Sequence, residues 1–203
     1  MKKLLIAALT LAPLGAQARP QERKIHVVTT LVILKHVAER VGGDRVTAVA
    51  VAHPKRDPHS ITAAPVMQRQ AGEADLFIYL GRGLDLWAKD IIQGSGNTRI
   101  QSGNGQLVAS KDCTVLELPK VLSKEWGDVH SEGNPHMWLD PLNVEQIAIN
   151  VCGALCAVDP AGKGAYEANL KKFLLEIDEA MFGKGLVGEE GGEILWRKLR
   201  LGK

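Results

Sequence analysis

The sequence predicts an α/β fold, in which a parallel β-sheet is flanked by helices and followed by one long helix. Residues 24–29 and 45–51 are short runs rich in β-branched residues, and residues 31–41 between them place apolar side chains at helical spacing. A strand, a helix and a strand within about 30 residues are typical of a βαβ unit, whose two strands are parallel. Near the other end, residues 165–182 carry an apolar stripe that would suit a helix about 27 Å long.

The middle of the chain continues the alternation of strands and helices. We expect helices at residues 64–74 and 84–92, with a buried strand at residues 75–80 between them. The next stretch reads as a surface loop, two short strands and an irregular polar segment, at residues 94–105, 106–110, 113–118 and 120–133.

Two helices are predicted in the last third. Asp140 and Pro141 are a favourable N-cap and first helical residue, and Asp159-Pro160 ends the apolar stripe that follows. Beyond the long helix, residues 183–192 are rich in glycine and resemble a hinge, and residues 193–203 form a short basic amphipathic end. The stripes of the two helices are Ile147, Val151, Leu155 and Val158, and Tyr166, Leu170, Phe173, Leu174, Ile177 and Met181.

The first 18 residues have the pattern of a secretory signal peptide. Lys2 and Lys3 precede an apolar run at residues 4–14, and Ala16-Gln17-Ala18 matches a cleavage site. The apolar run is too short to span a bilayer. Because no cysteine follows it, we expect a mature protein that is exported to the periplasm and is not lipid-anchored.

Composition excludes some classes of partner. The net charge is +2 and aromatic residues make up 4% of the chain, so neither charge nor stacking favours nucleic acid or an anionic membrane. The cysteines are Cys113, Cys152 and Cys156, an odd number, and we expect small buried hydrophobic side chains rather than a metal site of thiolates. Their redox state stays open.

Two histidines lie on segments that prolines make stiff. His59 follows Pro58 in the loop after the second predicted strand, and His136 lies just after Pro135. Ligands in open α/β sheets bind beyond the carboxyl ends of the strands, where we expect His59 to lie. A stiff loop suits metal coordination, because the ligand atoms must converge accurately. His59 and His136 are therefore candidate metal ligands.

The remaining histidines are weaker candidates. His130 lies six residues before His136 in a polar segment, so it either reaches the site as a further ligand or stays exposed in its loop. His53 shares the loop of His59 but is less rigidly placed. His26, on the first predicted strand, and His36, on the first predicted helix, are expected to have structural roles rather than to bind metal.

Three segments resemble the metal-binding solute-binding proteins of bacterial ABC importers for zinc, manganese or iron. These segments are residues 57–60 (Asp-Pro-His-Ser), 74–85, which include Ala-Asp-Leu-Phe-Ile-Tyr-Leu-Gly, and 134–141 (Asn-Pro-His-Met-Trp-Leu-Asp-Pro). Their order and spacing match the family throughout residues 24–182.

The resemblance implies half of a two-lobe periplasmic binding protein followed by a long linker helix. In the family, two histidines from the first lobe, matching His59 and His136, hold the metal together with a histidine or glutamate and a carboxylate from the second lobe. The chain ends soon after the linker helix, so the resemblance also implies a truncated second lobe. The expected division is a signal peptide, an N-terminal α/β metal-binding lobe, a long interlobe helix and the truncated start of a second lobe, at residues 1–18, 19–160, 161–183 and 184–203.

The function that this resemblance implies is capture of a divalent transition metal in the periplasm for an ABC transporter permease. Imidazole suits zinc, copper, iron and nickel, and we expect zinc rather than manganese or iron. We expect no enzyme activity, no insertion into the membrane after signal cleavage, and self-association through the exposed part of the linker helix. One alternative is a degenerate fragment with weak or no metal binding. A metal-dependent hydrolase is disfavoured, because the sequence contains no His-Glu-x-x-His motif.

Overall fold

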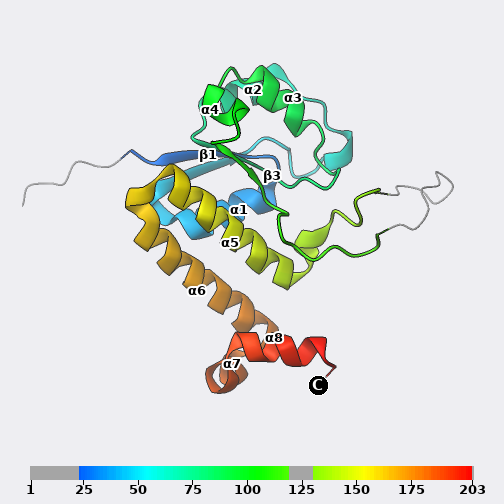
Figure 1. The fold of residues 1–203 in the computed structure, drawn as a ribbon, viewed down its shortest axis with the longest axis vertical. Helices are drawn as coiled ribbons and strands as arrows, with labels where there is room; N and C mark the ends of the chain where they lie inside the picture. Colours follow the sequence, from blue (N-terminus) through cyan, green and yellow to red (C-terminus); the bar gives the residue numbers. More distant parts are fainter. Residues whose placement is uncertain (1–22, 119–129, 203) are drawn as a thin grey trace, which may run out of the picture.

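A parallel sheet forms the centre of the fold in the computed structural model, which describes residues 23–118 and 130–202 (Figure 1). The strands of this sheet lie in the order β2-β1-β3-β4, and each neighbouring pair is parallel. The prediction of a parallel sheet is therefore confirmed. The strands are β1 (Ile25–Thr29), β2 (Val46–Ala50), β3 (Leu76–Tyr79) and β4 (Gln106–Val108).

Helices cover both faces of the sheet (Figure 1). On one side lie α1 (Val32–Gly42), α5 (Pro141–Val158) and α6 (Lys163–Phe182). On the other side lie α2 (Pro65–Gly72), α3 (Ala88–Gly94) and α4 (Thr98–Gln101). Because both faces are covered, the central strands β1 and β3 bury consecutive residues rather than alternate ones. Their fully buried residues include Val27, Val28, Leu76, Phe77 and Ile78.

The junctions of α5 confirm the predicted start and stop of this helix. Oδ1 of Asp140 accepts a hydrogen bond from the backbone N–H of Leu142 at 3.0 Å. At the other end, Oδ2 of Asp159 accepts from the guanidinium of Arg45 at 3.0 Å and from the hydroxyl of Tyr166 at 2.6 Å. By length and composition α5 would also suit a membrane span, but one face of it packs against α1, α6 and the sheet.

The end of the chain differs from the prediction. The glycine-rich residues 183–192, which resembled a hinge, contain the helix α7 (Lys184–Glu190), and α8 (Gly192–Arg200) follows directly. Both helices pack against the far end of α6 (Figure 1). Within α8, Leu195 and Trp196 are buried. Packing on α6 therefore stabilises segments whose glycines are poor helix formers.

Three other predictions about the middle of the chain are wrong. The loop at residues 94–105 contains α4, because the side chain of Asn97 accepts hydrogen bonds from the backbone N–H groups of Arg99 and Ile100 and caps a helical turn. Helix α3 begins at Ala88 rather than at residue 84. Residues 113–118 form no strand, because their backbone groups pair elsewhere. The N–H of Thr114 donates to Oδ1 of Asn143, and the carbonyl of Leu116 accepts from the N–H of Asn134.

Several expectations concern residues outside the described part of the chain. These are the signal peptide and residues 120–129 of the predicted irregular segment. The three cysteines are free, and Cys113 and Cys152 are buried, as expected for small hydrophobic side chains.

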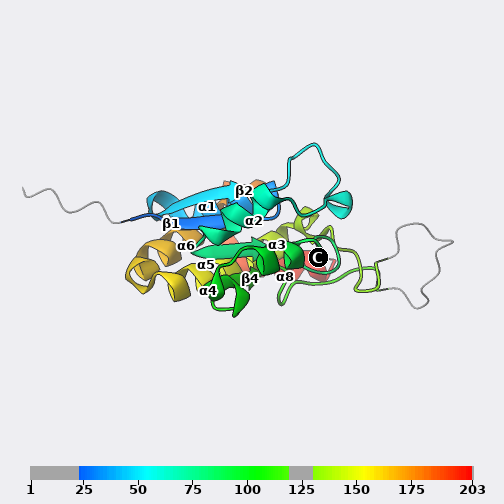
Figure 2. The same cartoon turned by 90° about the horizontal axis from the view of Figure 1, so that it is seen from above.

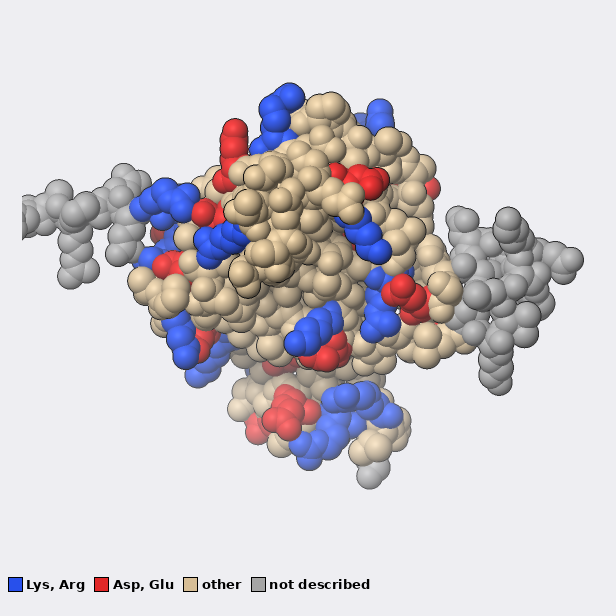
Figure 3. Space-filling view, turned by 45° about the horizontal axis from the view of Figure 1, so that its top comes forward, with Lys and Arg blue, Asp and Glu red and all other residues tan. Residues whose placement is uncertain are grey.

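Basic and acidic side chains are interspersed on the face shown in Figure 3, and large uncharged areas separate them. This distribution agrees with the low net charge of +2. On this face, the described residues therefore offer no single-sign patch for a polyanion.

Candidate metal centre

His59 lies on a single 3₁₀ turn, Pro58–Ser60, in the loop that follows β2. Asp57 caps this turn, because its Oδ1 accepts the backbone N–H of His59 at 2.9 Å. The same oxygen lies 2.8 Å from Nδ1 of the His59 ring. We therefore assign the ring proton to Nδ1, which leaves the lone pair of Nε2 free for another partner.

His136 lies immediately before the 3₁₀ turn Met137–Leu139 that leads into α5. Its backbone N–H donates to Oδ1 of Asn134 at 2.9 Å. The ring of Trp138 packs edge-on against the His136 ring, with centroids 5.2 Å apart. Trp138 also borders a cavity that it shares with Pro54 and Pro58 of the His59 loop. Trp138 thus contacts the His136 ring and faces the His59 loop across this cavity.

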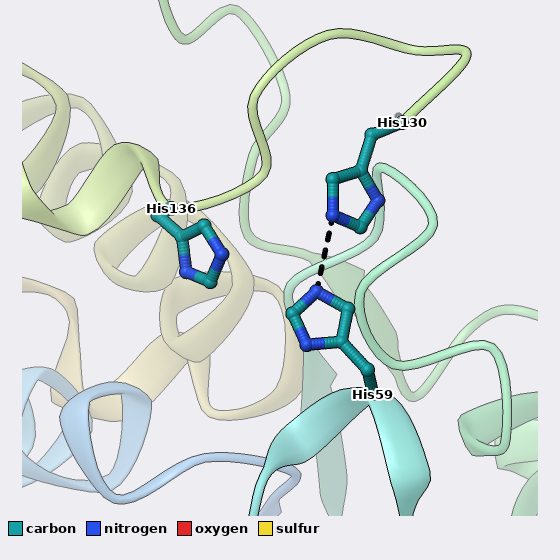
Figure 4. A group of neighbouring side chains, drawn as sticks. All are labelled: His59, His130 and His136. Carbon is teal, nitrogen blue, oxygen red and sulfur yellow. Dashed lines mark hydrogen bonds between the residues drawn. The ribbon is translucent and has the colours of Figure 1, made fainter. Parts of the chain in front are cut away.

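The structure brings His130 to the same place. Figure 4 shows the rings of His59, His130 and His136 converging, with His59 on the loop after β2 and His130 and His136 on one segment before α5. Nε2 of His59 and Nε2 of His130 are 3.1 Å apart, and the three potential ligand atoms all lie within 4.8 Å of one another. Two nitrogens that each bind a tetrahedral zinc at 2.0–2.1 Å would be about 3.3 Å apart. The His59–His130 spacing is therefore close to that of two ligands of one ion.

The surroundings of His136 favour its neutral ring. Burial lowers the pKa of His136 below its ordinary value, and the neighbouring His59 and His130 lower this pKa further. Conversely, the hydrogen bonds from the backbone and then the ring of His59 lower the pKa of Asp57, so this carboxylate stays ionised beside the ring. Neutral imidazoles with free lone pairs are the form that binds a transition metal.

The other histidines do not join this group. The exposed His53 uses its Nδ1 to accept the N–H of Lys55, and Nδ1 of His26 faces the carbonyl of Glu73. His36 contacts the ring of Phe173 on α6. Sequence reasoning missed Asp57 as a partner of the His59 ring, although its position two residues before the histidine, followed by proline, is a recognisable capping signal.

Comparisons with known proteins identify the family. The family model described as zinc-uptake complex component A, periplasmic (ZnuA), matches residues 27–181. A relative from Streptococcus anginosus, named manganese ABC transporter substrate-binding lipoprotein PsaA, is 26% identical over 181 residues, which cover 87% of this chain and 55% of the relative. Another, lipoprotein scaA of Streptococcus gordonii, named for the same role, is 27% identical over 86% of this chain and 56% of its own length.

Solved structures support the fold. A crystal structure titled ZnuA matches with a TM-score of 0.65 and 24% identity, over 77% of this chain and 55% of that one. The metal-dependent lipoprotein YcdH of Bacillus subtilis matches with a TM-score of 0.63 and 22% identity, over 77% and 53%.

The chain belongs to the ZnuA family, which confirms the resemblance to metal-binding solute-binding proteins of ABC importers. It spans about half the length of the curated relatives that it matches. The two relatives reported above are named lipoproteins, so the expectation of a protein without a lipid anchor differs from what their names state.

Proposed function

We propose that this chain captures a divalent transition metal for an ABC importer, and that His59, His130 and His136 bind the metal. The observation that carries the proposal is the convergence of three imidazoles whose potential ligand atoms lie within 4.8 Å of one another. Membership of a family of metal-binding transport components, rather than enzymes, supports it.

The proposed metal is zinc. The group of converging ligands among the described residues consists of imidazoles, and Asp57 approaches it only through Nδ1 of His59. Imidazole ligands suit zinc, and binding by a given site follows an order in which zinc stands well above manganese. Three imidazoles would leave one tetrahedral position, which water or another protein group would fill.

The wider setting is part of the same proposal. The chain acts in the periplasm and hands its metal to a membrane permease. Its residues divide into a metal-binding α/β lobe up to residue 160, the interlobe helix at 161–183, and the start of a second lobe at 184–203. Self-association would use the exposed part of the helix, where Leu175 and Met181 are 46% and 44% exposed.

The test is a calorimetric titration of the chain with zinc and with manganese. We expect a zinc Kd of about 1 μM or tighter, and weaker binding of manganese. Replacing His59, His130 or His136 by Ala should weaken zinc binding by at least about 100-fold, because a lost ligand costs more than a lost outer-shell partner.

The matched control is His53→Ala, which removes an exposed imidazole from the same loop as His59 and should leave zinc binding unchanged. Wild-type protein that binds neither metal would favour a degenerate fragment over a receptor. Zinc binding that survives the His59 and His136 substitutions would place the metal elsewhere.

A further inference from the structure

The loop that carries His59 extends away from the sheet. Figure 2 shows the segment after β2 reaching out beyond the edge of the fold before it returns to α2. Residues 53–57 of this loop are exposed. A ligand on such a loop needs contacts that hold its backbone, because metal ligation tolerates only small displacements.

A buried tryptophan just before α3 contacts this loop. The indole Nε1–H of Trp87 donates to the carbonyl oxygen of Pro58 at 2.8 Å, and Trp87 is only 6% exposed. The Pro58 carbonyl belongs to the peptide unit that joins Pro58 to His59. The N–H of this unit is held at its opposite end by Oδ1 of Asp57 at 2.9 Å. Both polar groups of one peptide plane are therefore hydrogen-bonded, directly before the Cα of His59.

Trp87 is itself placed by the central strands. Asp85, two residues earlier, is 2% exposed and accepts three hydrogen bonds. They come from the hydroxyl of Thr30 after β1 at 2.6 Å and from the backbone N–H groups of Leu80 and Gly81 after β3 at 2.7 and 2.8 Å. The carbonyl of Asp85 then accepts the N–H of Ala88, which starts α3. The turn that presents Trp87 is thus anchored to the carboxyl ends of two core strands.

We propose that Trp87 is a positioning residue for metal capture: its indole N–H fixes the Pro58–His59 peptide and so aims the His59 ring at the metal centre. The role in metal capture rests on the proposed function. The immobilisation of His59 by Trp87 does not, because it can be measured in metal-free protein. Through this hydrogen bond, the exposed loop is held by a residue whose own turn is anchored to the central strands.

The test is Trp87→Phe, which keeps an aromatic ring and removes only the N–H donor and part of the ring area. Trp196→Phe is the matched control, because Trp196 is equally buried but donates to Glu145 and Asp178 under α8. The first readout is the ¹⁵N order parameter of the His59 amide in metal-free protein. We expect a value near 0.85 in the wild type and the control, and a value below about 0.6 in Trp87→Phe.

The second readout is the zinc Kd. We expect Trp87→Phe to weaken zinc binding by about 2- to 10-fold, the equivalent of one hydrogen bond, and Trp196→Phe to leave it unchanged. Asp57→Ala, which releases the opposite end of the same peptide, should lower the same order parameter and provides a second route if Trp87→Phe folds poorly.

The outcomes separate the two proposals. An unchanged His59 order parameter in Trp87→Phe would overturn the positioning role, whether or not the zinc Kd changes. A lowered order parameter with unchanged zinc affinity would show that the rigidity of His59 does not serve metal binding. Absence of zinc binding in the wild type would overturn the proposed function, while the order parameter would still decide whether Trp87 immobilises His59.

Discussion

At the scale of single residues, Asp57 caps the turn of His59 and also contacts the His59 ring, and one substitution can separate these two roles. Its Oδ1 contacts both the backbone N–H and the ring Nδ1 of His59, at 2.9 and 2.8 Å. An amide at this position keeps an oxygen that can accept the backbone N–H, but it loses the negative charge that supports a metal-bound imidazole.

We therefore expect Asp57→Asn to weaken zinc binding by about 10-fold, with little change in thermal stability. Calorimetric titration with zinc measures the first quantity and a melting curve the second. Asp90→Asn, an exposed carboxylate on α3, is the control and should bind zinc like the wild type. Equal affinities for Asp57→Asn and the wild type would exclude a role for the charge.

Gly133 allows the segment before His136 to turn back closely on residues 115–116. Its φ is +86°, and a Cβ there would lie 2.4 Å from Cγ1 of Val115 and 2.9 Å from the carbonyl oxygen of Leu116. Gly133→Ala should therefore combine backbone strain with a steric clash.

Gly96 separates these two effects, because its φ is +67° but a Cβ there meets nothing within 4 Å. We expect Gly96→Ala to lower the free energy of unfolding by about 1 kcal/mol and Gly133→Ala to lower it by about 1–3 kcal/mol more. Urea denaturation measures both. Similar losses for the two variants would mean that the segment at 115–116 can move aside.

At the scale of elements, a shared hydrogen bond docks α8 on α5 and α6. The indole Nε1–H of Trp196 on α8 lies 2.7 Å from Oδ1 of Asp178 on α6 and 3.1 Å from Oε1 of Glu145 on α5. Burial raises the pKa of Glu145 to about 7, and the negative charges of Asp178 and then Asp140 raise it as well. Near neutral pH, Glu145 therefore takes up a proton in the folded protein.

This raised pKa predicts how stability depends on pH. The pKa of Glu145 in the folded protein exceeds the ordinary value of 4.5. Glu145 therefore contributes a stabilising free energy that is fully present below pH 4.5 and is lost as the pH rises through about 7. The free energy of unfolding should fall over this range, by less than about 1.4 kcal/mol per pH unit.

Glu145→Gln should flatten this dependence and be more stable than the wild type at pH 8. Urea denaturation at pH 5, 6, 7 and 8 measures the difference, and Glu189→Gln, an exposed residue of α7, is the control. A wild-type profile that runs parallel to that of Glu145→Gln would contradict the raised pKa.

The elements that sequence reasoning missed are short and weakly periodic. Helix α4 offers one buried apolar residue, Ile100, and depends on the side chain of Asn97, whose amide also donates to the carbonyls of Ala71, Gly72 and Ala74. Helix α7 contains two glycines and buries Val187 against its neighbours. Neither has enough intrinsic helix propensity to be visible before the tertiary contacts are known.

At the scale of the whole molecule, the candidate metal centre joins segments that are far apart in the chain. His59 and His130 are 71 residues apart, and their rings contact each other (Figure 4). The parallel sheet makes this possible, because the carboxyl ends of its strands all face the same edge. The described part of the chain thus brings three imidazoles together.

The sequence by itself determined the strands of the sheet, the long helices, and the two histidine segments that prolines frame. These features depend on hydrophobic periodicity and on the fixed φ of proline, which are local properties of the chain. Only the tertiary structure decided that His130 converges with His59 and His136, that Asp57 orients a ring, and that Trp87 holds the peptide before His59. Those contacts depend on how distant segments pack and on where each side chain points, and no local pattern of residues specifies either.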